Sequence, residues 1–182
     1  MSTSSKVSTS AQNYADSLIK VGQDGVMTYD AILTDLNTIK EITSNSKDLV
    51  DVMENPAIST NVKDEILYNV FSNQINEKLI NFLKVLIDKK RFYELNEIIE
   101  AYSDKVDEIY NIKRVEVVSA VDVSDDKKQK LVEKLQNKLQ KTVIANWYTD
   151  KSIIGGLVIK IDDDVIDNSL KNKLENLSKN II

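Results

Sequence analysis

Cysteine and histidine are both absent from the 182 residues of the chain. The lack of cysteine excludes disulfides, thiolate metal sites and cysteine nucleophiles, and the lack of histidine excludes Ser-His-Asp triads and the commonest metal ligand. Four glycines and one proline leave little material for loop-built sites and favour helices. No apolar run approaches the ~18 residues of a membrane span. The sequence therefore predicts a soluble, largely helical protein with no catalytic residues.

Arginine is also scarce, since Arg91 and Arg114 are the only two, and the net charge is −5. Both facts argue against a nucleic-acid partner, which requires clustered basic side chains. The charge is uneven along the chain. Residues 1–111 carry 11 basic and 18 acidic side chains, whereas residues 112–182 carry 13 basic and 11 acidic ones. This asymmetry is consistent with two units that face different partners or with ordinary surface variation.

Helical spacing of apolar residues runs from Ala11 to about Asn111. Breaks at Gly22 and Gly25, at residues 43–46 and at Pro56 divide this stretch into about six helices. Residues 1–10 are rich in serine and threonine, so we expect them to form a disordered tail. Residues 11–111 are expected to form a six-helix bundle.

The fifth predicted helix, which follows Asn76, has an unusually wide apolar surface. Its apolar positions from Val85 round to Ile80 cover roughly 220°, against the ~100° stripe of a surface helix. Two explanations remain open from the sequence. The helix lies at the centre of the bundle, or part of its apolar surface receives a helix from another protein.

The hydrophobic period changes near residue 112. We predict three strands, two helices and the order β-α-β-β-α. The predicted elements are a strand at 114–121, a helix after Ser124, strands at 142–148 and 157–161, and a closing helix at 170–181. The fold class expected is mainly α, with a smaller α+β domain at residues 112–182 after the helical bundle.

The remaining candidate sites are weak. Asp162-Asp163-Asp164 does not fit a calcium loop, because the position that should hold a bidentate Glu is Lys173. We expect these three residues to form an acidic turn in water before the last helix. Glu97, Glu100 and Asp104 are typical of the solvated face of an amphipathic helix. Trp147 and Tyr148 are adjacent in a predicted strand, so they point to opposite faces. We predict no catalytic, cofactor or metal site.

Several short motifs occur in a fixed order along the chain. They are Tyr14-Ala15-Asp16-Ser17-Leu18, Asn55-Pro56-Ala57-Ile58-Ser59 with Lys63, Asn81-Phe82-Leu83 with Lys89-Lys90-Arg91, Ser119-Ala120, and Ile154-Gly155-Gly156-Leu157 with Ile166-Asp167-Asn168-Ser169 and Leu174. In this order they resemble the delta subunit family of F-type ATP synthase, whose mitochondrial counterpart is the oligomycin-sensitivity-conferring protein. The resemblance runs from about Asn13 to Ile182. Its most specific part is a C-terminal signature made by Gly155, Gly156, Asp167 and Ser169.

Two departures from the family pattern are small. Asn168 stands where the family often has glycine, and asparagine is the usual substitute where a left-handed backbone is needed. Asn13 stands where the family often has a basic residue, so no charge is expected there.

The resemblance implies a non-catalytic stator subunit without a cofactor. Its helical bundle would bind the N-terminal helices of alpha subunits on the catalytic head, and its C-terminal domain would bind the b-type peripheral stalk. Association with the membrane would be indirect, on the cytoplasmic face of a bacterial inner membrane or the stromal face of a thylakoid. By helix-in-groove docking, the alpha-subunit helix would lie between the first helix (Tyr14, Leu18) and the fifth (Leu79, Phe82, Leu83, Leu86).

Two other functions are compatible with the residues. An unrelated two-domain helical adaptor of another complex would have the same composition and layout. Direct binding to a membrane surface by the lysine-rich helix at residues 127–141 is a further alternative, although its apolar stripe is better suited to packing in a core.

Overall fold

The computed structural model describes residues 7–179 and divides the chain into two compact units between Val106 and Asp107. The hydrophobic period changes a few residues later, at about residue 112. The boundary between the units lies before the change of period because Asp107 contacts the segment that follows it. Its carboxylate accepts hydrogen bonds from Arg114 Nε (2.6 Å) and Nη2 (3.0 Å).

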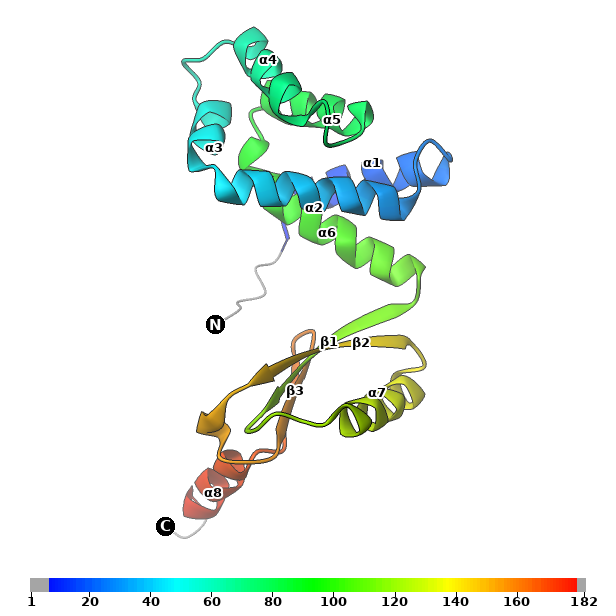
Figure 1. Ribbon diagram of the computed structural model, residues 1–182, viewed down its shortest axis with the longest axis vertical. Helices are drawn as coiled ribbons and strands as arrows, with labels where there is room; N and C mark the ends of the chain where they lie inside the picture. Colours follow the sequence, from blue (N-terminus) through cyan, green and yellow to red (C-terminus); the bar gives the residue numbers. More distant parts are fainter. Residues whose placement is uncertain (1–6, 180–182) are drawn as a thin grey trace. The chain divides into compact units, whose positions relative to one another are not determined.

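Six α-helices form the first unit within the described residues, which confirms the predicted helical bundle. They are α1 (Thr9–Gln23), α2 (Tyr29–Asn45), α3 (Lys47–Glu54), α4 (Thr60–Phe71), α5 (Glu77–Asp88) and α6 (Leu95–Ile109), with a 3-10 turn η1 (Phe92–Glu94) before α6 (Figure 1). Side chains cap several of these helices. The Ser8, Thr28, Ser46 and Asn76 side chains each accept a backbone N–H of the first turn.

The first helix begins two residues before the expected start at Ala11. Ser8 is its N-cap: the Ser8 hydroxyl oxygen accepts the Ala11 N–H (3.1 Å), and the Ser8 N–H donates to Glu97 Oε2 (3.2 Å). Val7 packs against the bundle core. These contacts order the chain from residue 7 onward, and residues 1–6 of the expected tail lie outside the described residues.

Helix α5 lies at the centre of the bundle, which accounts for most of its wide apolar surface. Its buried residues are Leu79, Ile80, Leu83, Leu86 and Ile87. It contacts α2, α4 and η1, so neighbours cover it on more than one side. Phe82 is only half-buried and Val85 is exposed, so one flank of α5 remains uncovered.

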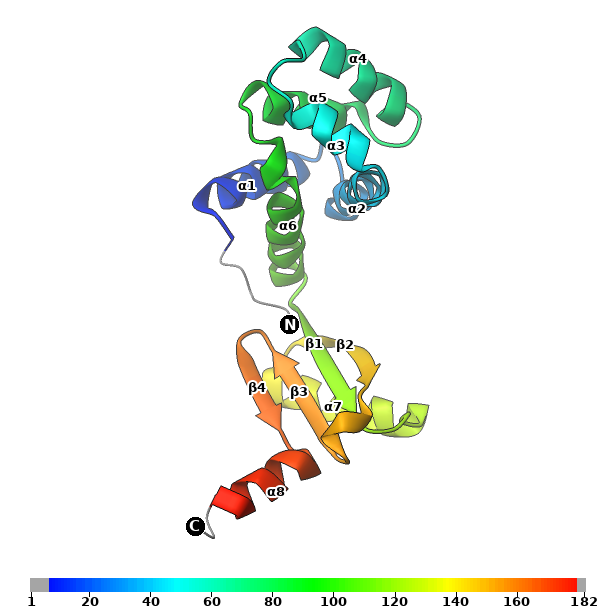
Figure 2. The same cartoon turned by 90° about the vertical axis from the view of Figure 1, so that its left-hand side faces the viewer.

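The second unit is a four-stranded sheet of order β2-β1-β3-β4 with two helices. Its elements are β1 (Ile112–Ser119), α7 (Asp125–Leu139), β2 (Thr142–Thr149), η2 (Lys151–Ile153), β3 (Leu157–Ile161), β4 (Asp164–Asp167) and α8 (Leu170–Lys179) (Figures 1 and 2). Strands β1 and β2 are parallel and are joined through α7, whereas β1, β3 and β4 pair antiparallel. The predicted α+β domain is therefore confirmed.

Strand β4 corrects the predicted order β-α-β-β-α. Residues 162–164 were expected to form an acidic turn in water, but the turn is confined to Asp162 and Asp163, and Ile161 pairs with Asp164 across a hairpin. All four residues of β4 are exposed at the edge of the sheet. The strand therefore lacks the alternation of apolar and polar residues by which a half-buried strand is predicted.

Helix α7 covers one face of the sheet, and the core of this unit lies between them (Figure 1). Val115, Val117, Val143 and Ile159 face Leu135 of α7 in this core. Trp147 packs on the same side, with Lys128 Nζ 5.8 Å from its ring centroid. Tyr148 is exposed, as the alternation of side chains along a strand requires.

Candidate functional site

The uncovered flank of α5 meets α1 at an aromatic pair. The Tyr14 ring of α1 and the Phe82 ring of α5 lie edge to face, with centroids 6.2 Å apart and an interplanar angle of 74°. Both side chains are half-buried. Of the six residues that the resemblance places in a partner groove, these two keep solvent-accessible surface.

The other four predicted groove residues belong to the core. Leu18, Leu79, Leu83 and Leu86 are all buried among the helices of the bundle. Tyr14 and Phe82 pack against the core that these leucines belong to, and the leucines themselves offer no free surface to a partner. A helical wheel cannot make this distinction, because Phe82 and its buried neighbours lie on one continuous apolar arc.

The structure extends the surface in two directions from the aromatic pair. Val85 follows Phe82 by one helical turn and is 45% exposed. On the α1 side, a shallow hollow of about 400 Å³ is lined by Ser10, Asn13, Tyr14, Ser17 and Arg91. The Arg91 guanidinium contacts the Ser10 hydroxyl and lies 3.6 Å from Glu94 Oε1. We use the name α1/α5 groove for this hollow, which Tyr14, Ser17 and Arg91 line, together with Phe82 and Val85 on the adjoining flank of α5.

The four C-terminal signature residues come together at the junction of β3 and α8. Gly156 has φ +84°, and a side chain there would overlap the Asn168 carbonyl oxygen and lie 3.1 Å from Ser169 Cα. A Cβ on Gly155 would lie 2.7 Å from Leu170 Cδ1. Both glycines therefore allow the segment before α8 to pass close to the start of β3.

Hydrogen bonds close this junction, which we call the glycine clasp (residues 155–157 with 167–170). The Leu170 N–H donates to the Gly155 carbonyl (2.9 Å), and the Asn168 N–H donates to the Leu157 carbonyl (3.0 Å). The Ser169 N–H donates to Asp167 Oδ1 (2.8 Å). Ser169 is buried and caps α8, since its hydroxyl oxygen accepts the Asn172 N–H (3.1 Å). The signature therefore holds α8 onto the sheet.

The geometry of the clasp predicts that the stability of the second unit depends on pH. Hydrogen bonds from the Ser169 hydroxyl and backbone N–H lower the pKa of Asp167 below its ordinary 3.8, with a smaller contribution from the Lys171 ammonium. A carboxylate whose folded-state pKa is lowered stabilises the fold above its unfolded pKa, and that stability is lost as the pH falls through the lowered value. The second unit should therefore lose stability on acidification from about pH 4 downward.

Urea unfolding followed by Trp147 fluorescence at pH 6 and pH 3 measures this effect, because Trp147 is the only tryptophan and lies in the second unit. Asp167→Asn should lower the urea midpoint at pH 6. It should also reduce the difference between the midpoints at pH 6 and pH 3. Asp163→Asn removes a carboxylate from the neighbouring turn and controls for net charge. A pH dependence that is the same in wild type and Asp167→Asn would contradict this role for Asp167.

Three of the acidic residues considered from sequence have local partners. Glu97 Oε2 accepts the Ser8 N–H, Glu100 lies 3.9 Å from Lys40 Nζ, and Asp162 pairs with Lys113. Among residues 7–179, no group of three or more acidic side chains could hold a metal ion. The same residues contain no helix whose length and apolar content would carry it across a bilayer.

The burial of one lysine was not identified from the sequence. Lys63 of α4 is 6% exposed, although lysine is normally a surface residue. Its Nζ donates to the Met53 carbonyl (2.7 Å), near the end of α3. The motif around Pro56 pointed to Lys63, but its burial depends on contacts between α3 and α4 that the sequence does not reveal.

Comparison with known proteins gives consistent matches along nearly the whole chain. The family model described as ATP synthase delta (OSCP) subunit matches residues 11–181. The ATP synthase subunit delta of Chlorobium limicola is 37% identical over 169 residues, which cover 93% of each chain. That of Clostridium botulinum (strain Loch Maree / Type A3) is 33% identical over 168 residues, which cover 92% of this chain and 93% of the relative.

A solved structure shares the fold. A chain in the cryo-EM structure of the Toxoplasma gondii mitochondrial ATP synthase hexamer matches 96% of this chain with a TM-score of 0.67 and 18% identity, and 98% of that chain is covered. The match to the family model and the identity to the curated relatives replace the alternative of an unrelated helical adaptor. The chain belongs to the ATP synthase delta (OSCP) subunit family.

Proposed function

We propose that the chain is a non-catalytic stator subunit of F-type ATP synthase. It links the N-terminal helices of alpha subunits on the catalytic head to the b-type peripheral stalk, so that proton flow is coupled to ATP synthesis. The observation that carries this proposal is membership of the delta subunit family over residues 11–181. Association with the membrane is through the complex, on the side that carries the head.

The α1/α5 groove has the features needed to hold an amphipathic helix of the alpha subunit. Tyr14, Phe82 and Val85 supply apolar and aromatic contact area, which is typical of helix-in-groove recognition. Arg91 lies at one end, and Lys78 and Lys89 are exposed on the same flank of α5. We therefore expect the partner helix to place apolar residues on Phe82 and acidic residues near these cations.

The second unit offers an apolar stripe on α8 for the stalk. Leu170, Leu174 and Leu177 recur at helical spacing and are 47%, 56% and 58% exposed. An amphipathic helix whose apolar stripe is exposed is typical of a surface that packs against another helix. The glycine clasp fixes the start of α8, so the stripe is presented on an anchored helix.

Leu174→Asp should separate stalk binding from head binding. A charge in the middle of the stripe would lose its hydration on packing against a helix, so the b-type subunit is expected to co-purify at one-tenth of the wild-type amount or less. The alpha subunit should co-purify unchanged. The measurement is affinity purification of the tagged chain from its own membranes, with quantitation of both partners.

Asn176→Asp is the matched control, because it adds the same charge on the opposite side of α8, where the side chain is also exposed. It should leave both partners bound. Equal losses of the b-type subunit with Leu174→Asp and Asn176→Asp would contradict the assignment of the stripe. Failure of both alpha and b-type subunits to co-purify with the wild-type chain would overturn the proposed function itself.

A further inference from the structure

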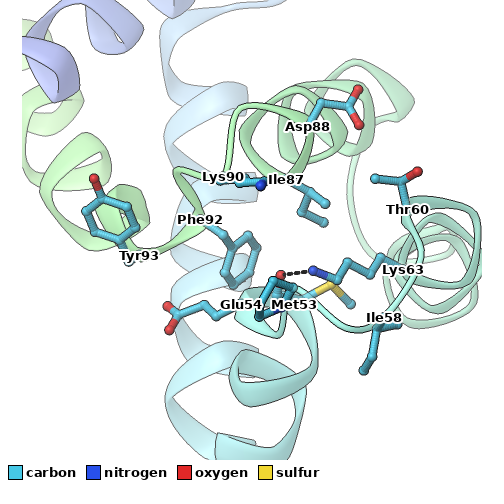
Figure 3. A pocket seen from close by; sticks show the side chains of 11 residues that line it. Met53, Glu54, Ile58, Thr60, Lys63, Ile87, Asp88, Lys90, Phe92 and Tyr93 are labelled. Carbon is cyan, nitrogen blue, oxygen red and sulfur yellow. Dashed lines mark hydrogen bonds between the residues drawn. The ribbon is translucent and has the colours of Figure 1, made fainter.

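A pocket that the proposed function does not use opens in the helical bundle. It has a volume of about 390 Å³ and lies between the α3–α4 turn, the end of α5 and η1 (Figure 3). This is at the small end of ligand-binding pockets, which span roughly 300–1,000 Å³. Much of the wall is apolar, and Met53, Ile58, Ile87 and Phe92 contribute to it. None of the residues that form the α1/α5 groove lines this pocket.

The buried Lys63 side chain also lines this pocket. Its Nζ donates to the Met53 carbonyl, which uses one of the three N–H groups of an ammonium. That bond gives Lys63 a structural role, since it satisfies a carbonyl in the last turn of α3. The bond does not neutralise the positive charge of the Lys63 ammonium. None of the ion pairs found among the described residues includes Lys63, and Figure 3 shows the carboxylates of Glu54 and Asp88 directed away from its Nζ.

A buried cation without a counter-charge favours an anionic ligand, because burial makes an unpaired charge costly. The apolar wall limits the kind of anion. A phosphate would need several donors, whereas one lysine and an apolar surface suit a single carboxylate attached to an apolar chain. Glu54, Asp88 and Lys90 also line the pocket, but all three are exposed, so Lys63 is the buried charge among the four.

We propose that this pocket binds a small amphiphilic monocarboxylate, with the carboxylate on Lys63 Nζ and the apolar chain against Ile58, Ile87 and Phe92. The site is separate from the α1/α5 groove, so it adds a ligand-binding activity to the proposed stator role. A ligand that binds only the folded bundle also stabilises it by mass action.

The test uses decanoate with the full chain, observed by NMR of methionine methyl groups labelled with carbon-13. Met53 lies in the pocket wall, and Met27 in the α1–α2 loop is an internal reference. Decanoate should shift the Met53 signal saturably at submillimolar concentration and leave Met27 unchanged. Decyltrimethylammonium, which has an unbranched chain of nearly the same length and the opposite charge, should leave the Met53 signal unshifted. An absent response to decanoate, or an equal response to both amphiphiles, would overturn the proposal.

Two variants locate the carboxylate and the chain. Lys63→Gln should weaken decanoate binding by at least about tenfold, because it removes a charge-assisted hydrogen bond. Lys84→Gln is its control, since Lys84 lies on the α4–α5 surface and pairs with Asp64 (4.0 Å) outside the pocket. Ile58→Trp fills the pocket from the turn, leaves Lys63 in place and should also abolish binding. If Lys63→Gln does not fold, decanoate binding by Ile58→Trp is the test of the proposed site. Wild-type decanoate affinity in either folded variant would overturn the proposal.

Discussion

Gly156→Ala is expected to lower the free energy of unfolding of the second unit by about 3 kcal/mol or more. Two effects add at this position. The residue has φ +84°, where an L side chain is strained, and the new Cβ would overlap the Asn168 carbonyl oxygen. Because the obstacle is backbone, no side-chain rotation relieves it. The chain can accept the methyl group only by moving α8 away from β3 and breaking the clasp.

Urea unfolding followed by Trp147 fluorescence isolates the second unit, while circular dichroism follows mainly the helices of the bundle, which hold most of the helical residues. Gly25→Ala is the control for backbone strain alone. Gly25 has φ +71°, and a methyl group there would meet no atom within 4 Å beyond its chain neighbours, so a cost of only about 1 kcal/mol is expected. Gly155→Ala should be intermediate, because it meets the flexible Leu170 side chain. A wild-type Trp147 transition in Gly156→Ala would contradict the clasp.

Val85→Asp is expected to weaken binding of a synthetic alpha-subunit N-terminal peptide by at least about tenfold, because docking would bury an unpaired carboxylate. Val85 is 45% exposed, so the substitution should leave the helical circular dichroism unchanged. Isothermal titration calorimetry with the peptide measures the affinity. By contrast, Leu83→Asp places a charge in the fully buried core and should unfold the bundle.

Val62→Asp is the matched control for this experiment. Val62 lies on α4, is 46% exposed and lines no part of the α1/α5 groove. It should bind the peptide as the wild type does. Equal weakening by Val85→Asp and Val62→Asp would show a general effect of charge and would contradict docking in the groove.

The helical part of the fold was predictable because each helix has a clear apolar period and a marked boundary. Asn76 illustrates this, since its side chain caps α5 at the position where the sequence places the start of the fifth helix. Strand β4 was not predictable in the same way. Its residues are all exposed, and its pairing with β3 depends on the two-residue turn at Asp162 and Asp163. When a strand has no buried face, its sequence need not alternate between apolar and polar residues, so the strand is hard to predict.

The candidate surfaces were only partly predictable. The sequence pointed to α1 and α5, but Phe82 and Leu83 are adjacent members of one apolar arc, and only the packed bundle shows that the first remains accessible. Motif resemblance identified Gly155 and Gly156, and a glycine pair at the start of a strand indicates a bulge or a close backbone approach, but the sequence does not show which segment approaches. The approach requires the β3–β4 hairpin, which brings Asn168 and Ser169 back to the glycines.

The central claim is that this chain braces the catalytic head against the stalk. Its most direct test is ATP-driven proton pumping in inverted membrane vesicles that have been depleted of the chain. We expect that ATP hydrolysis continues, that pumping is lost, and that adding back the wild-type chain restores pumping more effectively than adding back Val85→Asp. Pumping at the wild-type rate in fully depleted vesicles would contradict the account.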